Sequence, residues 1–108
     1  MNAYIILFSA ITCEVIGTML LPASQSFTKI IPTTLLTLSY ILSFYLLTLI
    51  TEKIPLSILY ASWSGLGVCL IAVLSYIFYK QTLSWQAVIG LFLIIVGVSL
   101  VNIFKGEL

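Results

Sequence analysis

The sequence predicts an all-α membrane protein that forms a single domain, residues 1–108, and crosses the bilayer four times. Of the 108 residues, 62% are hydrophobic and only 6% are charged, and the chain contains neither Arg nor His. A soluble domain carries about 25% charged residues, because its surface must face water. The composition therefore excludes a water-soluble enzyme, a nucleic-acid binder and a disordered chain.

Four apolar stretches approach the roughly 20 residues that a membrane-spanning helix requires. Pro22 can end the first helix, whereas Pro32 and Pro55 can begin the next two, because a first-turn N–H has no partner within the helix. The unbroken apolar run at 89–96 differs from the alternating pattern of a transmembrane β-strand. The expected helices are residues 4–21, 33–51, 56–79 and 85–104.

Glu14 is the one charged residue within an expected helix. It lies about 15 Å along the first helix at 1.5 Å per residue, close to the bilayer midplane. It also interrupts the apolar part of a stretch that has no basic start, which favours a retained helix over a signal peptide. The other six charges fall at expected water boundaries: Lys29, Glu52, Lys53, Lys80, Lys105 and Glu107.

A carboxylic acid at that depth costs about 2.5–3.5 kcal/mol on insertion scales and marks a proton or cation site by default. A low dielectric favours the protonated acid, whereas a bound cation favours the carboxylate. The two ligands would therefore compete for one group, as an antiporter requires. A structural acid, protonated and hydrogen-bonded to a neighbouring helix, is the alternative. Residues three, four or seven positions away share the face of Glu14: Leu7, Ala10, Ile11, Gly17, Thr18 and Leu21. All of these except Leu21 would line a pocket beside the acid.

The lysines divide evenly between the two sides of the membrane. With four spans, Lys29 and Lys80 lie on one side, and Lys53 and Lys105 lie on the other. Orientation follows the Lys and Arg bias of the loops, so a chain without a bias can insert both ways. Weak cues such as the N-terminus are the alternative determinant. Because four short helices provide few walls for a pathway, we expect a pocket between two copies, which form an inverted pair if they insert oppositely.

Aromatic residues in the second and third helices are candidates for binding an organic cation through cation–π contact. For a single Tyr or Phe, ordinary helix packing is the simpler explanation. Trp63 is different, because it lies about 11 Å into its helix whereas Trp usually prefers the interface. The candidates are Tyr40 in the second helix and Tyr60 and Trp63 in the third. Ser43, Phe44 and Leu47 share the face of Tyr40 and would line the pocket.

Two pairs of glycines interrupt the last two helices. Gly65 and Gly67 permit a bend in the third helix, with close packing as the alternative. Gly90 and Gly97 share a face of the fourth helix and would let another helix approach closely. That helix belongs either to a second copy of the chain or to the same chain.

Taken together, these residues resemble the small multidrug resistance family of bacterial proton-coupled exporters. The resemblance runs nearly end to end and rests on residues 13–18, 24–28, 55–67 and 94–98, with a Glu in the first helix and the run Tyr-Ala-Ser-Trp-Ser-Gly-Leu-Gly in the third. It implies an antiparallel homodimer with four helices per protomer, in which Glu14 of both copies binds protons or substrate. The other roles that it implies are cation binding by Tyr40, Tyr60 and Trp63, a bend at Gly65 and Gly67, and dimerisation through Gly90 and Gly97.

The chain departs from the family's pattern in the first loop. Leu21-Pro22 stands where a Lys is common, and Ser26 stands where a Gly commonly precedes the loop Phe. Guanidinium exporters of the family typically carry a Trp close after the Glu and a Thr before the third-helix Gly. Here those positions are Ile16 and Ser64. The chain therefore looks more like the branch that exports quaternary ammonium compounds and aromatic cations.

We therefore expect a secondary active transporter, not an enzyme, in the bacterial inner membrane. It would be a proton-coupled antiporter that exports lipophilic, quaternary ammonium or aromatic cations, with Glu14 of both protomers exchanging protons for cation. Its partners would be protons, organic cations, lipid and a second copy of the chain, and no cofactor, metal or nucleic acid is expected. The alternatives are a guanidinium exporter of the same family and a non-transporting subunit of a heteromeric membrane complex.

Overall fold

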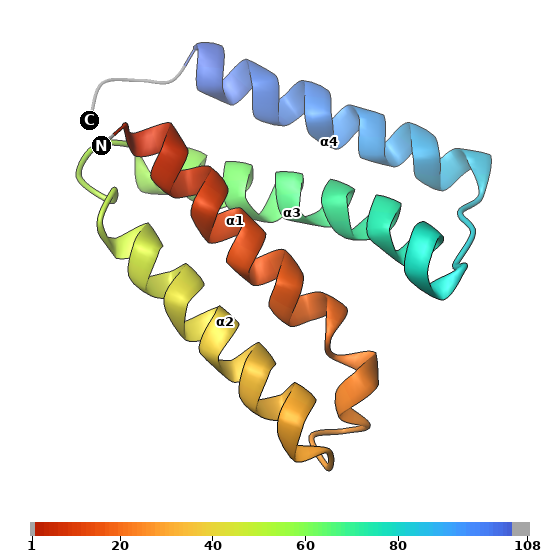
Figure 1. The fold of residues 1–108 in the computed structure, drawn as a ribbon. Coiled ribbons are helices and arrows are strands. Elements are labelled where there is room, and N and C mark those ends of the chain that lie inside the picture. Colours follow the sequence, from red (N-terminus) through yellow and green to blue (C-terminus); the bar gives the residue numbers. More distant parts are fainter. Residues whose placement is uncertain (1, 105–108) are drawn as a thin grey trace. The chain divides into compact units, whose positions relative to one another are not determined.

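The computed structural model describes residues 2–104, so that Lys105 and Glu107, the charges expected in the tail, lie outside the described residues. The described part is helical, which confirms the predicted all-α class (Figure 1). Its elements are α1 (Ala3–Met19), a short 3-10 helix η1 (Pro22–Ser24), α2 (Ile30–Thr48), α3 (Leu56–Tyr79) and α4 (Trp85–Ile103).

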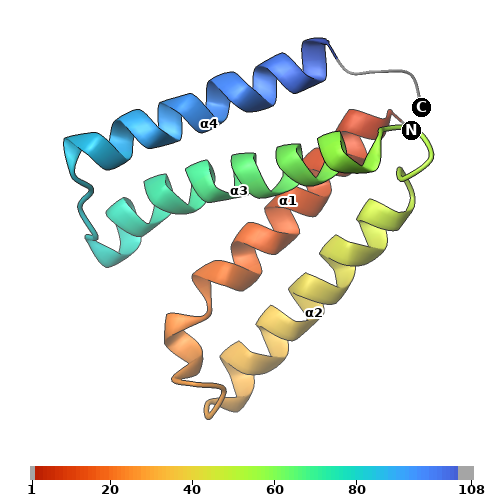
Figure 2. The ribbon, with the colours of Figure 1, turned by 180° about the vertical axis from the view of Figure 1, so that it is seen from behind.

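The chain divides into two compact units, one that ends at Ile50 and one that begins at Thr51. In the first unit α1 and α2 lie side by side and run in opposite directions (Figures 1 and 2). In the second unit α3 and α4 form another antiparallel pair. Each unit is therefore a helical hairpin.

The helix ends in the first unit differ from the expected ones. α1 begins at Ala3, where Asn2 Oδ1 accepts a hydrogen bond of 2.8 Å from the Tyr4 N–H, and it ends at Met19 instead of residue 21. α2 runs over 30–48 instead of 33–51. Pro32 lies inside its first turn, because any of the first-turn positions accepts a residue without an N–H.

The loop between η1 and α2 contains three consecutive residues in the left-handed region. Gln25, Ser26 and Phe27 have φ angles of 47°, 63° and 66°. Ser24 holds this turn together: its hydroxyl donates to the Leu21 carbonyl at 2.8 Å and accepts from the Phe27 N–H at 3.3 Å. A side chain in this region costs about 1–2 kcal/mol per residue, which explains why glycine is the usual residue in such turns.

The second unit matches the expected ranges closely. α3 begins directly after Pro55 and ends at Tyr79, where Lys80 has a φ of 55° and donates its N–H to the Ser75 carbonyl. α4 begins at Trp85, and the Ser84 hydroxyl caps it by accepting the Ala87 N–H at 3.2 Å. A serine N-cap satisfies one of the four free N–H groups at a helix start.

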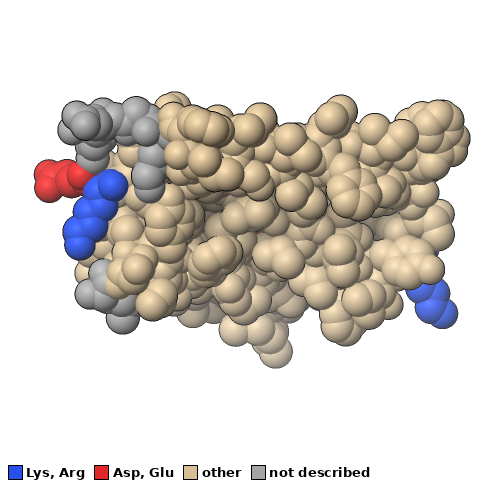
Figure 3. Space-filling model, turned by 90° about the horizontal axis from the view of Figure 1, so that it is seen from above, with Lys and Arg blue, Asp and Glu red and all other residues tan. Residues whose placement is uncertain are grey.

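The surface of the described chain suits a lipid solvent. α2, α3 and α4 are long and apolar enough to cross a membrane, whereas α1 is apolar but has only 17 residues. Large apolar side chains such as Phe8, Ile41 and Phe92 are more than half exposed. Among the described residues on the face drawn in Figure 3, uncharged side chains predominate. In a membrane such side chains meet acyl chains instead of water.

Candidate functional site

Glu14 lies on α1, about 16 Å from Ala3 at 1.5 Å per residue, and its two carboxyl oxygens have different surroundings. Oε1 accepts a hydrogen bond of 3.0 Å from the hydroxyl of Thr18, one turn further along α1. Oε2 is buried and has no hydrogen-bond partner among the described residues. A buried polar oxygen without a partner raises the free energy of the folded protein, and a proton or a cation bound at Oε2 would lower it.

Tyr40 extends this arrangement from α2. Its hydroxyl lies 2.7 Å from Thr18 Oγ1. Because Thr18 has one hydroxyl proton, which it donates to Glu14, the Tyr40 hydroxyl is the donor in this second bond. The chain of donors therefore runs from Tyr40 through Thr18 to the Glu14 carboxylate, and the sequence alone showed none of these contacts.

Gly17 lets the two helices approach at this point. A Cβ atom added there would lie 3.3 Å from both the Leu36 carbonyl oxygen and the Tyr40 ring carbon Cε1. A second bond joins the helices on the other side of Glu14, where the buried Ser43 hydroxyl donates to the Ala10 carbonyl at 2.7 Å. The cross-helix bonds thus hold α1 against α2 both before and after Glu14.

The remaining expected pocket residues of the first unit divide by exposure. Leu7, Ala10 and Ile11 are at most 1% exposed, so they are packed core residues in the described chain. Phe44 is 54% exposed and Leu47 is half-buried. Thr18 bonds Glu14 directly, and Tyr40 is joined to Glu14 through Thr18.

The second unit carries the aromatic pair expected in α3. The rings of Tyr60 and Trp63 lie 6.0 Å apart between centroids and are inclined by 31°. Tyr60 is 64% exposed, while Trp63 is half-buried. The Ser64 hydroxyl donates to the backbone carbonyl of Tyr60 at 2.7 Å.

The two glycine pairs differ in their surroundings. A Cβ atom added at Gly65 would lie only 2.7 Å from Val98 Cγ2, so this glycine allows close packing of α3 on α4. Gly67 is also buried, and α3 continues through both glycines as one helix. A bend at these positions stays a prediction. At Gly90 and Gly97 an added Cβ would meet no atom within 4 Å, so packing within the described chain does not require either glycine.

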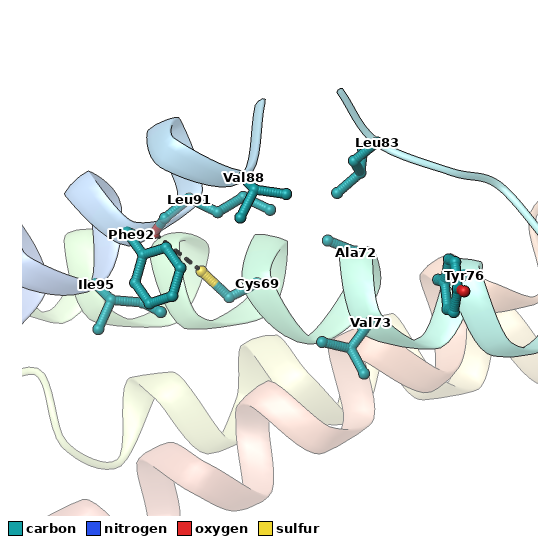
Figure 4. Close-up of a pocket in the computed structure, with 9 residues that line it drawn as sticks. All are labelled: Cys69, Ala72, Val73, Tyr76, Leu83, Val88, Leu91, Phe92 and Ile95. Carbon is teal, nitrogen blue, oxygen red and sulfur yellow. Dashed lines mark hydrogen bonds between the residues drawn. The ribbon is translucent and has the colours of Figure 1, made fainter. Parts of the chain in front are cut away.

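An apolar cavity of about 400 Å³ lies between α3 and α4 (Figure 4). It contains none of the predicted site residues and no acid. Beside it the Cys69 thiol donates to the Leu91 carbonyl at 3.8 Å. The lining residues are Cys69, Ala72, Val73, Tyr76, Leu83, Val88, Leu91, Phe92 and Ile95. Glu14 is therefore not part of this cavity.

Together, the fold and the site define a small multi-pass α-helical membrane protein with one acid, Glu14, within its apolar helices. The sequence model of the protein family described as Small Multidrug Resistance protein matches residues 2–94 of this chain. The chain belongs to the small multidrug resistance family of four-helix membrane proteins, as its sequence motifs predicted.

Similar proteins cover nearly the whole chain. The multidrug transporter EmrE of Escherichia coli (strain K12) is 45% identical over 105 residues, which are 97% of this chain and 96% of EmrE. The quaternary ammonium compound-resistance protein QacG of Staphylococcus sp. (strain ST94) is 42% identical over 101 residues, 94% of each chain. The multidrug resistance protein EbrA of Bacillus atrophaeus is 43% identical over 99 residues, 92% of this chain and 94% of EbrA.

Proposed function

We propose that this protein is a proton-coupled antiporter that exports lipophilic, quaternary ammonium and aromatic cations across the inner membrane of a bacterium. Protons bind Glu14 from the outside. A cation that arrives from the cytoplasm or the inner leaflet displaces them, and exchange between inward-facing and outward-facing shapes carries the cation out. The family membership supports a transporter in place of an enzyme, and similar proteins are named for multidrug transport and quaternary ammonium resistance.

The observation that carries the proposal is the divided environment of the Glu14 carboxyl group. Thr18 fixes one oxygen at 3.0 Å, while the other is buried without a partner in the described chain. A proton and a cation would both satisfy that second oxygen, and each excludes the other. This mutual exclusion is what couples the inward flow of protons to the outward flow of cations.

Aromatic side chains support a cation that is organic and not a metal ion. Tyr40 lies within the hydrogen-bonded group of Glu14, and Tyr60 and Trp63 present two neighbouring ring faces in the second unit. Ring faces attract a delocalised or alkylated cation that cannot donate many hydrogen bonds. Names such as quaternary ammonium compound-resistance protein for relatives agree with this class of cargo.

We propose further that the working form is an antiparallel homodimer. The open surroundings of Gly90 and Gly97 on α4 support self-association. Residues without a side chain let a helix of a second copy approach closely at these positions. The even division of the lysines supports insertion in both orientations. Each dimer would then contain two Glu14 side chains.

The test is Glu14→Gln in purified protein reconstituted into liposomes. The amide keeps the shape of the side chain but neither ionises nor exchanges a proton. We expect wild-type protein to bind tetraphenylphosphonium more weakly as pH falls, since protons then occupy the carboxylate, and to release protons on binding. Glu14→Gln should lose both effects and all gradient-driven export.

Glu52→Gln is the matched control, because Glu52 lies between α2 and α3 and is exposed. It should behave as wild type. Gradient-driven export by Glu14→Gln would contradict the mechanism. Binding of guanidinium with refusal of tetraphenylphosphonium would favour the guanidinium exporter, and a wild-type chain that moves no cation alone would favour the subunit of a heteromeric complex.

A further inference from the structure

The contact between α3 and α4 contains one polar pair that the proposed exchange at Glu14 does not use. Asn102 Nδ2 donates to Ser62 Oγ at 2.7 Å and to the Val98 carbonyl of its own helix at 2.8 Å. Ser62 is 1% exposed, and both residues lie in strongly apolar helices. Polar groups in such apolar surroundings are unfavourable without a hydrogen bond, so this bond is expected to stay formed. Because hydrogen bonds are directional, it also fixes how the two side chains face each other.

This pair is one end of a packed stripe along α3. Next in the stripe comes Gly65, where an added Cβ would lie 2.7 Å from Val98 Cγ2 and 3.1 Å from Ile94 Cγ2. It continues to Cys69, whose thiol donates to the Leu91 carbonyl at 3.8 Å. Residues three or four positions apart lie on one face of a helix. Ser62, Gly65 and Cys69 therefore form the face that α3 turns toward α4.

The aromatic pair lies on a different side of α3. Successive residues on a helix are separated by about 100°, so Trp63 points away from the face that holds Ser62, and Tyr60 lies still further round. The 64% exposure of Tyr60 agrees with this placement. Any rotation of α3 about its axis would change the direction of both rings.

We propose that Ser62 and Asn102 are positioning residues for cation binding. Their hydrogen bond fixes the rotation of α3 against α4, and thereby the direction in which the Tyr60–Trp63 ring pair faces. The apolar contacts at Gly65 tolerate small rotations, whereas the amide-to-hydroxyl bond is directional and does not. The consequence for cations rests on the proposed function, but the effect on the rings does not.

The first experiment follows the rings without any cation. The chain has two tryptophans, so a Trp85→Phe background leaves Trp63 as the only indole emitter. In that background we expect Asn102→Leu and Ser62→Ala to shift the emission of Trp63 in ligand-free protein. Ser62→Ala is the gentler variant, because Asn102 keeps its bond to the Val98 carbonyl.

The second experiment measures tetraphenylphosphonium affinity. Each single variant should weaken binding about threefold to tenfold, the effect of losing one hydrogen bond. The pH dependence of binding should stay that of wild type, since Glu14 is untouched. The double variant should be no weaker than Asn102→Leu alone, because both changes break the same bond. Ser9→Ala is the matched control, since the Ser9 hydroxyl bonds only its own helix at the Ile5 carbonyl.

Three outcomes would overturn the positioning role: wild-type Trp63 emission in both single variants, wild-type affinity in both, or additive losses in the double variant. Failure of the proposed function is distinguishable from these outcomes. In that case the Trp85→Phe protein itself would bind no tetraphenylphosphonium, or would bind it equally at every pH, while Trp63 emission would still report whether Asn102 holds the rings.

Discussion

Thr18 is the residue that makes the two oxygens of Glu14 unequal. It donates to one carboxyl oxygen and accepts from Tyr40, so it connects the acid on α1 with an aromatic ring on α2. In the proposed mechanism, in which a cation binds the carboxylate, cation binding would therefore depend on the neutral hydroxyl of Thr18.

Thr18→Val should weaken cation binding. Valine has a similar size but no hydroxyl, so the Glu14 carboxyl group loses the donor at Oε1. We expect the affinity for tetraphenylphosphonium at one fixed pH to fall about threefold to tenfold. Binding isotherms measure the change. Tyr40→Phe, which keeps the bond from Thr18 to Glu14, should weaken binding less, and an equal or larger loss would contradict the donor order.

Ser26 occupies a backbone conformation that suits glycine. Its φ of 63° lies between two other left-handed residues, and glycine is common at this position in the family. Ser26→Gly removes the cost of a side chain in the left-handed region, but glycine also makes the unfolded chain more flexible, which partly offsets this gain. We therefore expect the free energy of unfolding to rise by about 0.5–1 kcal/mol. Thermal unfolding in detergent measures the change. Ala23→Gly, in the right-handed η1 helix, should lower stability instead, and a gain there would remove the conformational explanation.

At the scale of the helices, we expect Gly65 to matter for folding and Gly97 to matter for the proposed self-association. Gly65→Ala places a methyl group 2.7 Å from Val98 Cγ2, so it should destabilise the α3–α4 pair by about 1–3 kcal/mol. Gly97→Ala meets nothing within 4 Å and should leave the fold unchanged. It should weaken self-association, which cross-linking or size-exclusion chromatography in detergent would detect. If Gly97→Ala unfolds the chain while Gly65→Ala does not, the assignment is reversed.

The helices and the buried acid could be predicted because both are properties of single segments. Apolar length locates α3 and the start of α4, and Glu14 is visible as one acid within an apolar run. The start of α2 was misplaced, since Pro32 is compatible with several positions in a first turn. The bonds from Thr18 to Tyr40 and from Asn102 to Ser62 depend on how helices pair. Sequence spacing within one helix does not show which residues of two helices meet. The polarity of Asn102 within an apolar run was a signal for the bond to Ser62.

At the scale of the whole molecule, the lysines should control how the chain assembles. Orientation in the membrane responds to Lys and Arg and only weakly to acids. A chain with Gln81→Lys and Lys53→Gln should insert in one orientation, and a chain with Lys80→Gln and Glu52→Lys in the other. Each alone should lose cation resistance, and co-expression of the two should restore it. Growth in the presence of a quaternary ammonium compound measures the outcome.

The control is Gln81→Glu, which changes the charge of the same loop without adding a lysine. It should retain the resistance of wild type. Full resistance from either fixed-orientation variant expressed alone would contradict the need for oppositely inserted copies.

The helices of this four-helix membrane protein differ in length. α1 has 17 residues and α3 has 24, which correspond to about 26 Å and 36 Å at 1.5 Å per residue. The hydrocarbon core of a bilayer is about 30 Å thick, so a helix as long as α3 can fit by tilting, whereas one as short as α1 can be accommodated by a thinner bilayer or by flanking residues that reach the interface. Because Glu14 lies on the short helix, the acyl-chain length of the surrounding lipid acts on the helix that carries the acid. A difference in helix length is thus built into the chain, and membrane thickness becomes a physical variable of the proposed exchange reaction.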